Sequence, residues 1–262
     1  MCLLAFNWND HPDYKLILVA NRDEFFERPS QQLHQWESGI FAGKDLRAGG
    51  TWLGMHPSGR FAALTNYRDL KNLQKYEKSR GDLVKNYLEG QQDPLEYLKE
   101  IEAEMQEYDG FNLLIGDQKN LYYLSNKSDK GVQKLAPGIY GLSNALLETP
   151  WKKLVKAKEN LKSHISKGDF QMDSLMKGQH SKETEAPELL PDTGATPEQE
   201  ILLSAQFINV GDYYGTVNGT VLLWDHSGKV RMKERVFDQV KGTYEDSELS
   251  FKINSEVEHN AR

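Results

Sequence analysis

Short apolar runs separated by turn-forming residues open the chain. Residues 3–8 and 15–21 are such runs, and residues 9–13 between them read N-D-H-P-D. Runs of this length, rich in β-branched and large apolar residues and bounded by Asn, Asp and Pro, are typical of β-strands. The pattern predicts an N-terminal hairpin that presents Cys2 at a sheet end, followed by an irregular stretch over residues 22–29.

The rest of the chain alternates between strand-like and helix-like patterns. Further strands are predicted over residues 51–56, 60–66, 111–116, 121–124, 138–143, 220–225 and 229–237, and helices over residues 82–88, 94–108 and 150–165. Within the second helix, Leu95, Leu98, Ile101 and Met105 recur at helical spacing on one face. The polar, proline-containing residues 167–197 are expected to form a mobile insertion.

The order of these elements is strands, helices, strands, helix, strands. It is not the strict strand–helix alternation of a parallel sheet, so a Rossmann-type fold is disfavoured. We expect an α+β protein in which helices cover two antiparallel sheets. The 262-residue length fits one large domain over residues 1–245, with residues 246–262 as a polar C-terminal tail.

Charge and composition narrow the possible functions. The net charge of −7 and the lack of a basic stripe disfavour nucleic-acid binding. No run of about 18 apolar residues occurs, so no membrane span is expected. With one cysteine and scattered histidines, neither a disulfide nor a zinc site is expected. The N-terminus lacks a basic leader, and we expect a cytoplasmic protein with no metal or cofactor.

Cys2 is the first residue that can carry chemistry. Because its side chain is small, Met1 is expected to be removed, which would place a free α-amino group beside the thiol. An α-amine with a pKa of about 8 can accept the thiol proton near neutral pH. Cys2 would then supply both nucleophile and base. The alternative is that Cys2 is a small buried hydrophobic residue on the first strand.

Polar residues at predicted strand ends could complete such a site. Arg22 could orient a substrate carboxylate or hold the thiolate, and Asp23 could accept a hydrogen bond from the new N-terminal ammonium. Asn66 and Asn144 each end or follow a strand, where their amide groups could stabilise an oxyanion. The alternatives are a surface salt-bridge loop for the first pair and turn formation for the two asparagines.

Several motifs resemble one family over nearly the whole chain. They are M-C-L-L-A-F, A-N-R-D-E-F-F-E-R-P, G-G-T-W-L-G-M-H-P-S-G-R-F-A-A-L-T-N-Y-R, F-N-L-L-I-G-D, Y-G-L-S-N-A-L-L-E-T-P-W-K-K, L-P-D-T-G and Y-Y-G-T-V-N-G-T-V-L-L-W-D. Together they resemble the NRDE family, also called the transport and Golgi organization protein 2 family. That family is similar in turn to N-terminal-nucleophile hydrolases of the penicillin and bile-salt amidase type.

The resemblance implies a four-layer αββα sandwich. It also implies that Cys2 matches the nucleophile, that Arg22 and Asp23 match a nearby Arg/Asp pair, and that Asn66 and Asn144 match two strand-end asparagines. One departure concerns charge. Many relatives read Y-G-T-R before the last hairpin, whereas this chain has Val217 in place of the arginine.

Two functional hypotheses follow, with a small-molecule substrate or a hydrophobic ligand as the partner. The first is a hydrolase or acyltransferase that uses Cys2 on an amide or thioester. The second is a non-catalytic carrier of a hydrophobic anion (haem, an acyl-CoA or a lipid) in trafficking or homeostasis. A third, weaker reading is a scaffold that has kept the fold and lost the chemistry.

Overall fold

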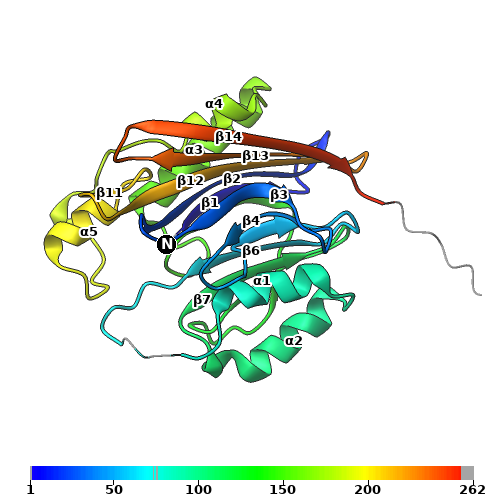
Figure 1. Cartoon of the computed structure of the whole chain (residues 1–262), viewed down its shortest axis with the longest axis horizontal. Coiled ribbons are helices and arrows are strands. Elements are labelled where there is room, and N and C mark those ends of the chain that lie inside the picture. The colour runs from blue at the N-terminus through cyan, green and yellow to red at the C-terminus, as the bar shows by residue number, and fades with distance from the viewer. Residues whose placement is uncertain (1, 73, 75, 255–262) are drawn as a thin grey trace, which may run out of the picture.

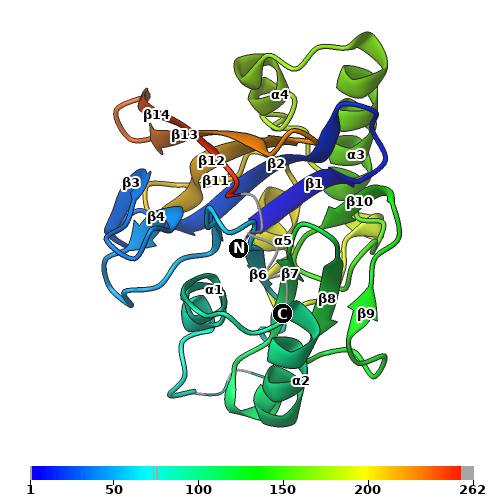
Figure 2. The same cartoon turned by 90° about the vertical axis from the view of Figure 1, so that its right-hand side faces the viewer.

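Two antiparallel β-sheets pack face to face, and helices cover the outer face of each (Figure 1). The computed structural model describes residues 2–72, 74 and 76–254. Viewed from the side, the layers run from α3 and α4 through the two sheets to α1 and α2 (Figure 2). The α+β class and the four-layer αββα arrangement predicted from the sequence are therefore confirmed.

The first sheet holds both ends of the described chain. Its strand order is β10 (Gly138–Leu142), β1 (Cys2–Trp8), β2 (Tyr14–Phe25), β12 (Tyr214–Asp225), β13 (Lys229–Asp238) and β14 (Thr243–Lys252), and β11 (Asn209–Val210) pairs with β12. The two central strands, β2 and β12, are also the longest. The N-terminal hairpin and the last hairpin of the chain thus lie side by side.

The second sheet follows the order of the sequence. Its strands are β3 (Ser30–Gln35), β4 (Phe41–Asp45), β5 (Leu53–Met55), β6 (Phe61–Asn66), β7 (Phe111–Gly116), β8 (Leu121–Ser125) and β9 (Gln133–Lys134). The helices are α1 (Arg80–Glu89), α2 (Pro94–Glu104), α3 (Lys152–Lys167), α4 (Met172–Lys177) and α5 (Pro197–Leu203), with 3-10 turns η1 (Met105–Glu107) and η2 (Pro187–Leu189).

Strand alternation divides the apolar residues among three layers. Side chains such as Leu4 and Leu18 enter the core between the sheets, where they meet Phe61 and Leu114 of the second sheet. Their neighbours Leu3, Ala5, Ile17 and Val19 face α3 and α4. Leu64 and Leu113 pack instead against Leu83, Val84, Leu98 and Ile101 of α1 and α2. Both faces of each sheet are therefore buried.

Three sequence-based predictions of local structure need correction. Residues 22–25 are not irregular, because they continue β2, which pairs with strands on both sides. Residues 246–252 are not part of a loose tail, because they belong to β14 and pair with β13 along their length; residues 255–262 lie outside the described residues. Residues 172–177 are not part of a mobile insertion, because they form α4, whose Leu175 and Met176 are buried against the first sheet; the mobility of residues 178–197 stays a prediction.

A close backbone approach joins the start of α1 to the loop before β5. A Cβ atom added at Gly50 would lie 2.7 Å from the carbonyl carbon of Gly81, whereas a Cβ at Gly81 would lie 3.4 Å from its nearest neighbour, the Thr51 oxygen. Only at Gly50 of this pair would a larger residue clash with neighbouring atoms, so only this position of the two requires glycine for steric reasons.

These two glycines make a matched pair for a stability test. We expect Gly50→Ala to lower the free energy of unfolding by about 1–3 kcal/mol, because backbone atoms must move apart. Gly81→Ala should raise it by about 0.5–1 kcal/mol, because alanine favours the first turn of α1. Urea unfolding of both variants measures the difference. Equal effects of the two substitutions would contradict the close approach.

Candidate active site

A cavity of about 370 Å³ lies at the strand ends beside Cys2. Four of the five site residues predicted from the sequence line it, namely Cys2, Arg22, Asp23 and Asn66. They come from β1, β2 and β6, so the cavity lies where the two sheets meet. Asn144, the fifth, is not among the described lining residues, although it contacts one of them.

Cys2 is the first residue of β1 and only 6% exposed. It pairs directly with Arg22 across the sheet, and its carbonyl oxygen accepts a hydrogen bond of 3.1 Å from Ser143 Oγ. Burial raises the pKa of the Cys2 thiol to about 11, although the nearby Arg22 opposes the shift. At neutral pH the group is therefore a thiol, and chemistry at Sγ requires a nearby base. The predicted removal of Met1 lies outside the described residues.

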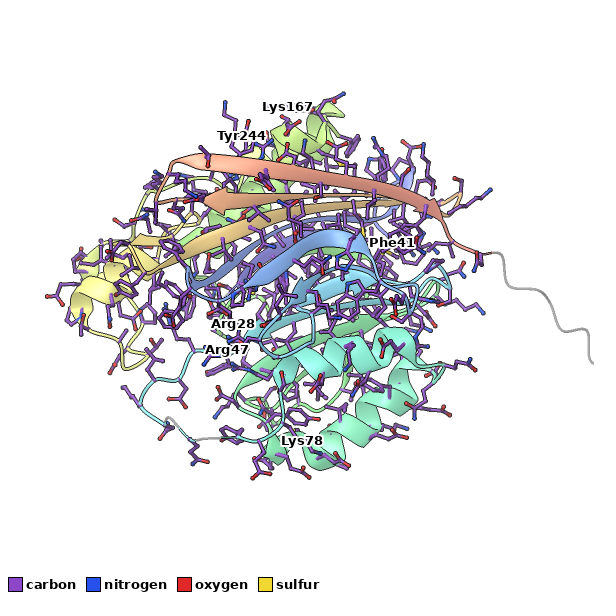
Figure 3. All side chains as sticks on the ribbon, in the orientation of Figure 1. Arg28, Phe41, Arg47, Lys78, Lys167 and Tyr244 are labelled. Carbon is purple, nitrogen blue, oxygen red and sulfur yellow. The ribbon has the colours of Figure 1, made fainter. Side chains whose placement is uncertain are left out.

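Arg22 of β2 lies next to Cys2, and one nitrogen of its guanidinium group has no hydrogen-bond partner among the described residues. Its Nη2 donates to Glu24 at 3.3 Å and lies 3.9 Å from Asp45. Asp45 also pairs with Arg28 at 2.7 Å, so Arg22 does not hold this carboxylate alone. Figure 3 shows Arg28 near the centre of the molecule, between the sheet layers and Lys78. Arg22 Nη1 is buried and has no hydrogen-bond partner in the described chain, so it can donate to a substrate oxygen.

Asp23 belongs to a buried charge cluster behind the nucleophile. Its Oδ1 accepts a hydrogen bond of 2.7 Å from Thr216 Oγ1, and burial raises the pKa of its carboxyl group. Lys153 of α3 is also buried, and its Nζ donates to the Leu203 carbonyl at 3.0 Å. Burial lowers the pKa of Lys153 to about 8, while its attraction to Asp23 opposes that shift. The sequence analysis missed Lys153, which lies more than a hundred residues away along the chain.

The two predicted asparagines differ in their surroundings. Asn144 is fully buried, and its Nδ2 donates to the backbone carbonyl of Asn66 at 3.0 Å. Asn66 lines the cavity, and its side-chain amide makes no hydrogen bond within the described part of the chain. Asn66 is therefore the one that offers a free amide to the cavity, and Asn144 fixes the backbone beneath it.

A residue that the sequence analysis passed over also lines the cavity. Asn218 of β12 stands opposite Arg22, because a register shift between Thr216 and Asn218 makes Val217 the extra residue of a bulge. Asn218 Nδ2 donates to Glu234 of β13 at 2.6 Å. The bulge places Asn218, and not Val217, in the row with Cys2 and Arg22. A bulge gives no signal in the hydrophobic pattern of β12.

Neither a metal centre nor a membrane segment is apparent where the structure is described. Across residues 2–72, 74 and 76–254, no group of three or more His, Cys, Asp or Glu side chains is placed to hold a metal ion. No helix in the same ranges is both long enough and apolar enough to cross a membrane.

The pH dependence of stability tests the burial of Glu234, which holds Asn218 in the row with Cys2 and Arg22. Its carboxylate accepts hydrogen bonds from Asn218 and from the Leu33 amide at 2.8 Å, yet burial raises its pKa. The folded chain therefore keeps the Glu234 proton to higher pH than the unfolded chain does. The stability that this proton provides is present at low pH and is lost as the pH rises from the unfolded towards the folded pKa.

We therefore expect Glu234→Gln to gain stability relative to the wild type as the pH rises from about 4 to about 7. The glutamine of the variant cannot ionise. Altered hydrogen bonds also change the unfolding free energy, but a change that is the same at every pH cancels when the difference between variant and wild type is compared at two pH values. Urea unfolding of both proteins at each pH provides the measurement. A difference in unfolding free energy that does not change with pH would show that the pKa of Glu234 is not raised.

Comparison with known proteins identifies relatives along most of the chain. The model of the family described as Transport and Golgi organisation 2 matches residues 1–239. The Transport and Golgi organization 2 homolog of Mus musculus is 35% identical, with 97% of this chain and 100% of that protein covered. The Bos taurus homolog is 37% identical over 90% of this chain and 92% of its own length.

Solved structures that align with this chain are more distant in sequence. The Caenorhabditis elegans N-acylethanolamine-hydrolyzing acid amidase ortholog aligns with a TM-score of 0.47 at 11% identity, covering 85% of this chain and 92% of that one. A mutant conjugated bile acid hydrolase from Clostridium perfringens aligns with a TM-score of 0.47 at 9% identity, covering 97% of both chains. The match to the family model and the identity to its curated members show that the chain belongs to the Transport and Golgi organisation 2 family.

Proposed function

We propose that this protein is a cysteine hydrolase or acyltransferase that acts on an amide or thioester at Cys2. The observation that carries the proposal is the cavity itself. The only cysteine of the chain lines it, together with a buried Arg22 donor that has no described partner and the free amide of Asn66. Nucleophile and oxyanion donors that converge on one cavity are the arrangement that acyl transfer needs.

The reaction begins once removal of Met1 frees the α-amino group of Cys2. This amine takes the Sγ proton as sulfur attacks the substrate carbonyl carbon, and the C=O electron pair moves onto oxygen. Asn66 and Arg22 donate hydrogen bonds to the resulting oxyanion. Collapse of the intermediate breaks the C–N or C–S bond, and the ammonium returns its proton to the leaving group.

Water or a second acceptor then attacks the carbonyl carbon of the Cys2 thioester and gives its proton to the α-amine. The C–Sγ bond breaks, the acyl group leaves on the acceptor, and the ammonium returns the proton to Sγ. Asp23 accepts a hydrogen bond from the ammonium and keeps it beside Sγ, and Lys153 balances the charge of Asp23. Asn144 acts through Asn66, whose backbone it holds. Because the Cys2 thiol has a raised pKa, a base held next to Sγ is essential to this scheme.

The amino terminus is the first place to test the mechanism. We expect protein that begins at Cys2 to be acylated by a small acyl thioester at least roughly 100-fold faster than protein with one glycine added before Cys2, because the added residue displaces the base. Intact mass spectrometry follows the acyl adduct. The same proteins in urea give the background rate, since any exposed N-terminal cysteine exchanges slowly with thioesters.

Equal acylation rates for the two forms, after subtraction of that background, would contradict a role for the α-amine. The second candidate function would then gain support. A carrier of a hydrophobic ligand draws on the apolar cavity that adjoins the first one, although the carboxylates that line this cavity count against an anion such as haem or an acyl-CoA. A carrier requires Cys2→Ala to bind its ligand with unchanged affinity, because one thiol contributes little to the apolar area of the pocket.

Substitutions of the two asparagines should have different effects if Asn66 is the oxyanion donor. We expect Asn66→Ala to lower kcat by about 100- to 1000-fold with little change in KM. Asn144→Ala should instead lower the melting temperature, because it leaves the Asn66 carbonyl without its buried donor. Steady-state kinetics and thermal unfolding of both variants separate the effects. A larger kcat loss for Asn144→Ala at unchanged stability would exchange the two roles.

A further inference from the structure

A second cavity, of about 290 Å³, adjoins the one beside Cys2. Asn66, Glu24, Arg80 and Asp109 line both cavities, so the two share a wall. Because Asn66 is the proposed oxyanion donor, a group in the second cavity would lie about one side chain away from the bond that reacts at Cys2.

The second cavity differs from the first in its apolar character. Phe25, Leu70 and Tyr213 line it, and each is 40–50% exposed although each is large and apolar. They come from three segments that are distant in the sequence. The Phe25 ring lies 6.4 Å from that of Tyr213 and 5.1 Å from that of Tyr214. Exposed apolar side chains gathered from separate segments around one hollow are typical of a ligand site.

The base of this cavity is a small core of its own. Leu203 of α5, Val210 of β11 and Tyr214 of β12 are buried there and pack with Ile208. Phe25 ends β2 and pairs with Tyr214, and Tyr213 directly precedes β12, so the aromatic part of the rim is anchored to paired strands. Such a preformed cavity binds an apolar group without first ordering its walls.

Charges around the second cavity select against an anion. Arg68 pairs with Glu200 at 2.8 Å, and its guanidinium lies 4.8 Å from the centre of the Trp151 ring. Arg80 pairs with Asp109 at 2.9 Å. Two further carboxylates, Glu24 and Asp69, also line the cavity. Three carboxylates line the cavity against two arginines, and each arginine has an acidic partner, so an uncharged group is accommodated better than a negatively charged one. Arg68 Nε and Nη1 are buried without a hydrogen-bond partner among the described residues, so they can donate to a carbonyl or hydroxyl oxygen of that group.

We propose that the second cavity binds a neutral aromatic or aliphatic group of the molecule that reacts at Cys2. The substrate class is then an amide or thioester that carries an uncharged apolar group next to the reacting bond. The reaction at Cys2 rests on the proposed function, whereas the binding of the apolar group can be measured without it.

Binding is tested with two fluorescent dyes that have the same ring system and differ in charge. N-phenyl-1-naphthylamine is neutral, and 1-anilinonaphthalene-8-sulfonate is the same molecule with one sulfonate. Both are titrated by fluorescence into Cys2→Ala protein, in which no acyl transfer can occur. Tyr213→Ala in that background removes an exposed ring of the rim. Tyr244→Ala is the matched control, because Tyr244 is similarly exposed and lies on β14, where it lines neither cavity (Figure 3).

We expect the neutral dye to bind, to bind about tenfold more weakly to Tyr213→Ala, and to bind unchanged to Tyr244→Ala. The sulfonated dye should bind more weakly than the neutral one. Unchanged binding of the neutral dye to Tyr213→Ala, or tighter binding of the sulfonated dye, would overturn the assignment. Circular dichroism of each variant confirms that it is folded.

Reaction is tested with two thioesters of N-acetylcysteamine, one phenylacetyl and one succinyl, on protein that begins at Cys2. We expect faster acylation by the phenylacetyl thioester and about tenfold slower acylation of Tyr213→Ala by it. Equal rates for both thioesters with no effect of Tyr213→Ala would overturn this inference and leave the proposed function standing. Dye binding without acylation by either thioester would overturn the proposed function and, with it, the assignment of the bound group to a substrate.

Discussion

The site depends on the backbone pairing of β2 with β1 on one side and β12 on the other. This pairing puts Cys2, Arg22 and Asn218 directly opposite one another on three adjacent strands. Residues paired in this way have side chains about 4.5–5.5 Å apart at Cβ, so a cysteine, a cation and an amide are held together without any loop. A slip of one residue would turn every second side chain of β2 to the other face and separate the three.

The bulge at Val217 belongs to the same constraint. On the C-terminal side of the bulge, β12 pairs with β2 in the register that places Val221 and Leu223 against the outer helices. On its N-terminal side, Thr216 pairs with Asp23 and donates a hydrogen bond to the carboxylate of Asp23. The extra residue therefore lets one strand bury apolar groups along its length and present Asn218 and Thr216 on separate faces at its end. Val217, which replaces the arginine of many relatives, is the bulge residue. The difference in charge therefore lies outside the row that contains Cys2.

Sequence patterns predicted the parts of this structure that are set by local chemistry. The N-terminal hairpin, the last hairpin and β7 follow from apolar runs between turn residues, and α2 follows from the helical spacing of Leu95, Leu98 and Ile101. The presence of Cys2, Arg22, Asp23 and Asn66 at one cavity follows from strand ends that meet at one edge. Each of these features needs only a few neighbouring residues to be specified.

Features that depend on distant partners were not predictable in this way. β3 reads S-Q-Q-L-H-Q and residues 243–248 of β14 read T-Y-E-D-S-E, so neither stretch shows the apolar alternation of a strand. β14 is a strand because β13 pairs with it, and its charges suit a sheet edge that must not pair with another chain. Likewise nothing in the local sequence of Gln179 or Gln206 indicates a shared partner, yet their backbone carbonyls both accept hydrogen bonds of 2.9 Å from the Asn21 side chain.

Buried charged groups occur in several parts of the fold, including Arg60 and Lys233, and some of them lie near the strand end that carries Cys2. Asp23, Lys153 and Glu234 are all buried near one strand end, and burial shifts the pKa of each towards its neutral form. Apolar side chains of similar size would cost the fold less there, because a buried charge requires a partner and complete hydrogen bonding. Arg60 and Lys233 have such partners, because Arg60 donates to the Tyr87 carbonyl at 2.7 Å and Lys233 pairs with Asp173 at 2.9 Å. Buried groups with shifted pKa values gather at functional sites more often than elsewhere, and the position of Asp23 in the cavity wall beside Cys2 is consistent with the proposed function.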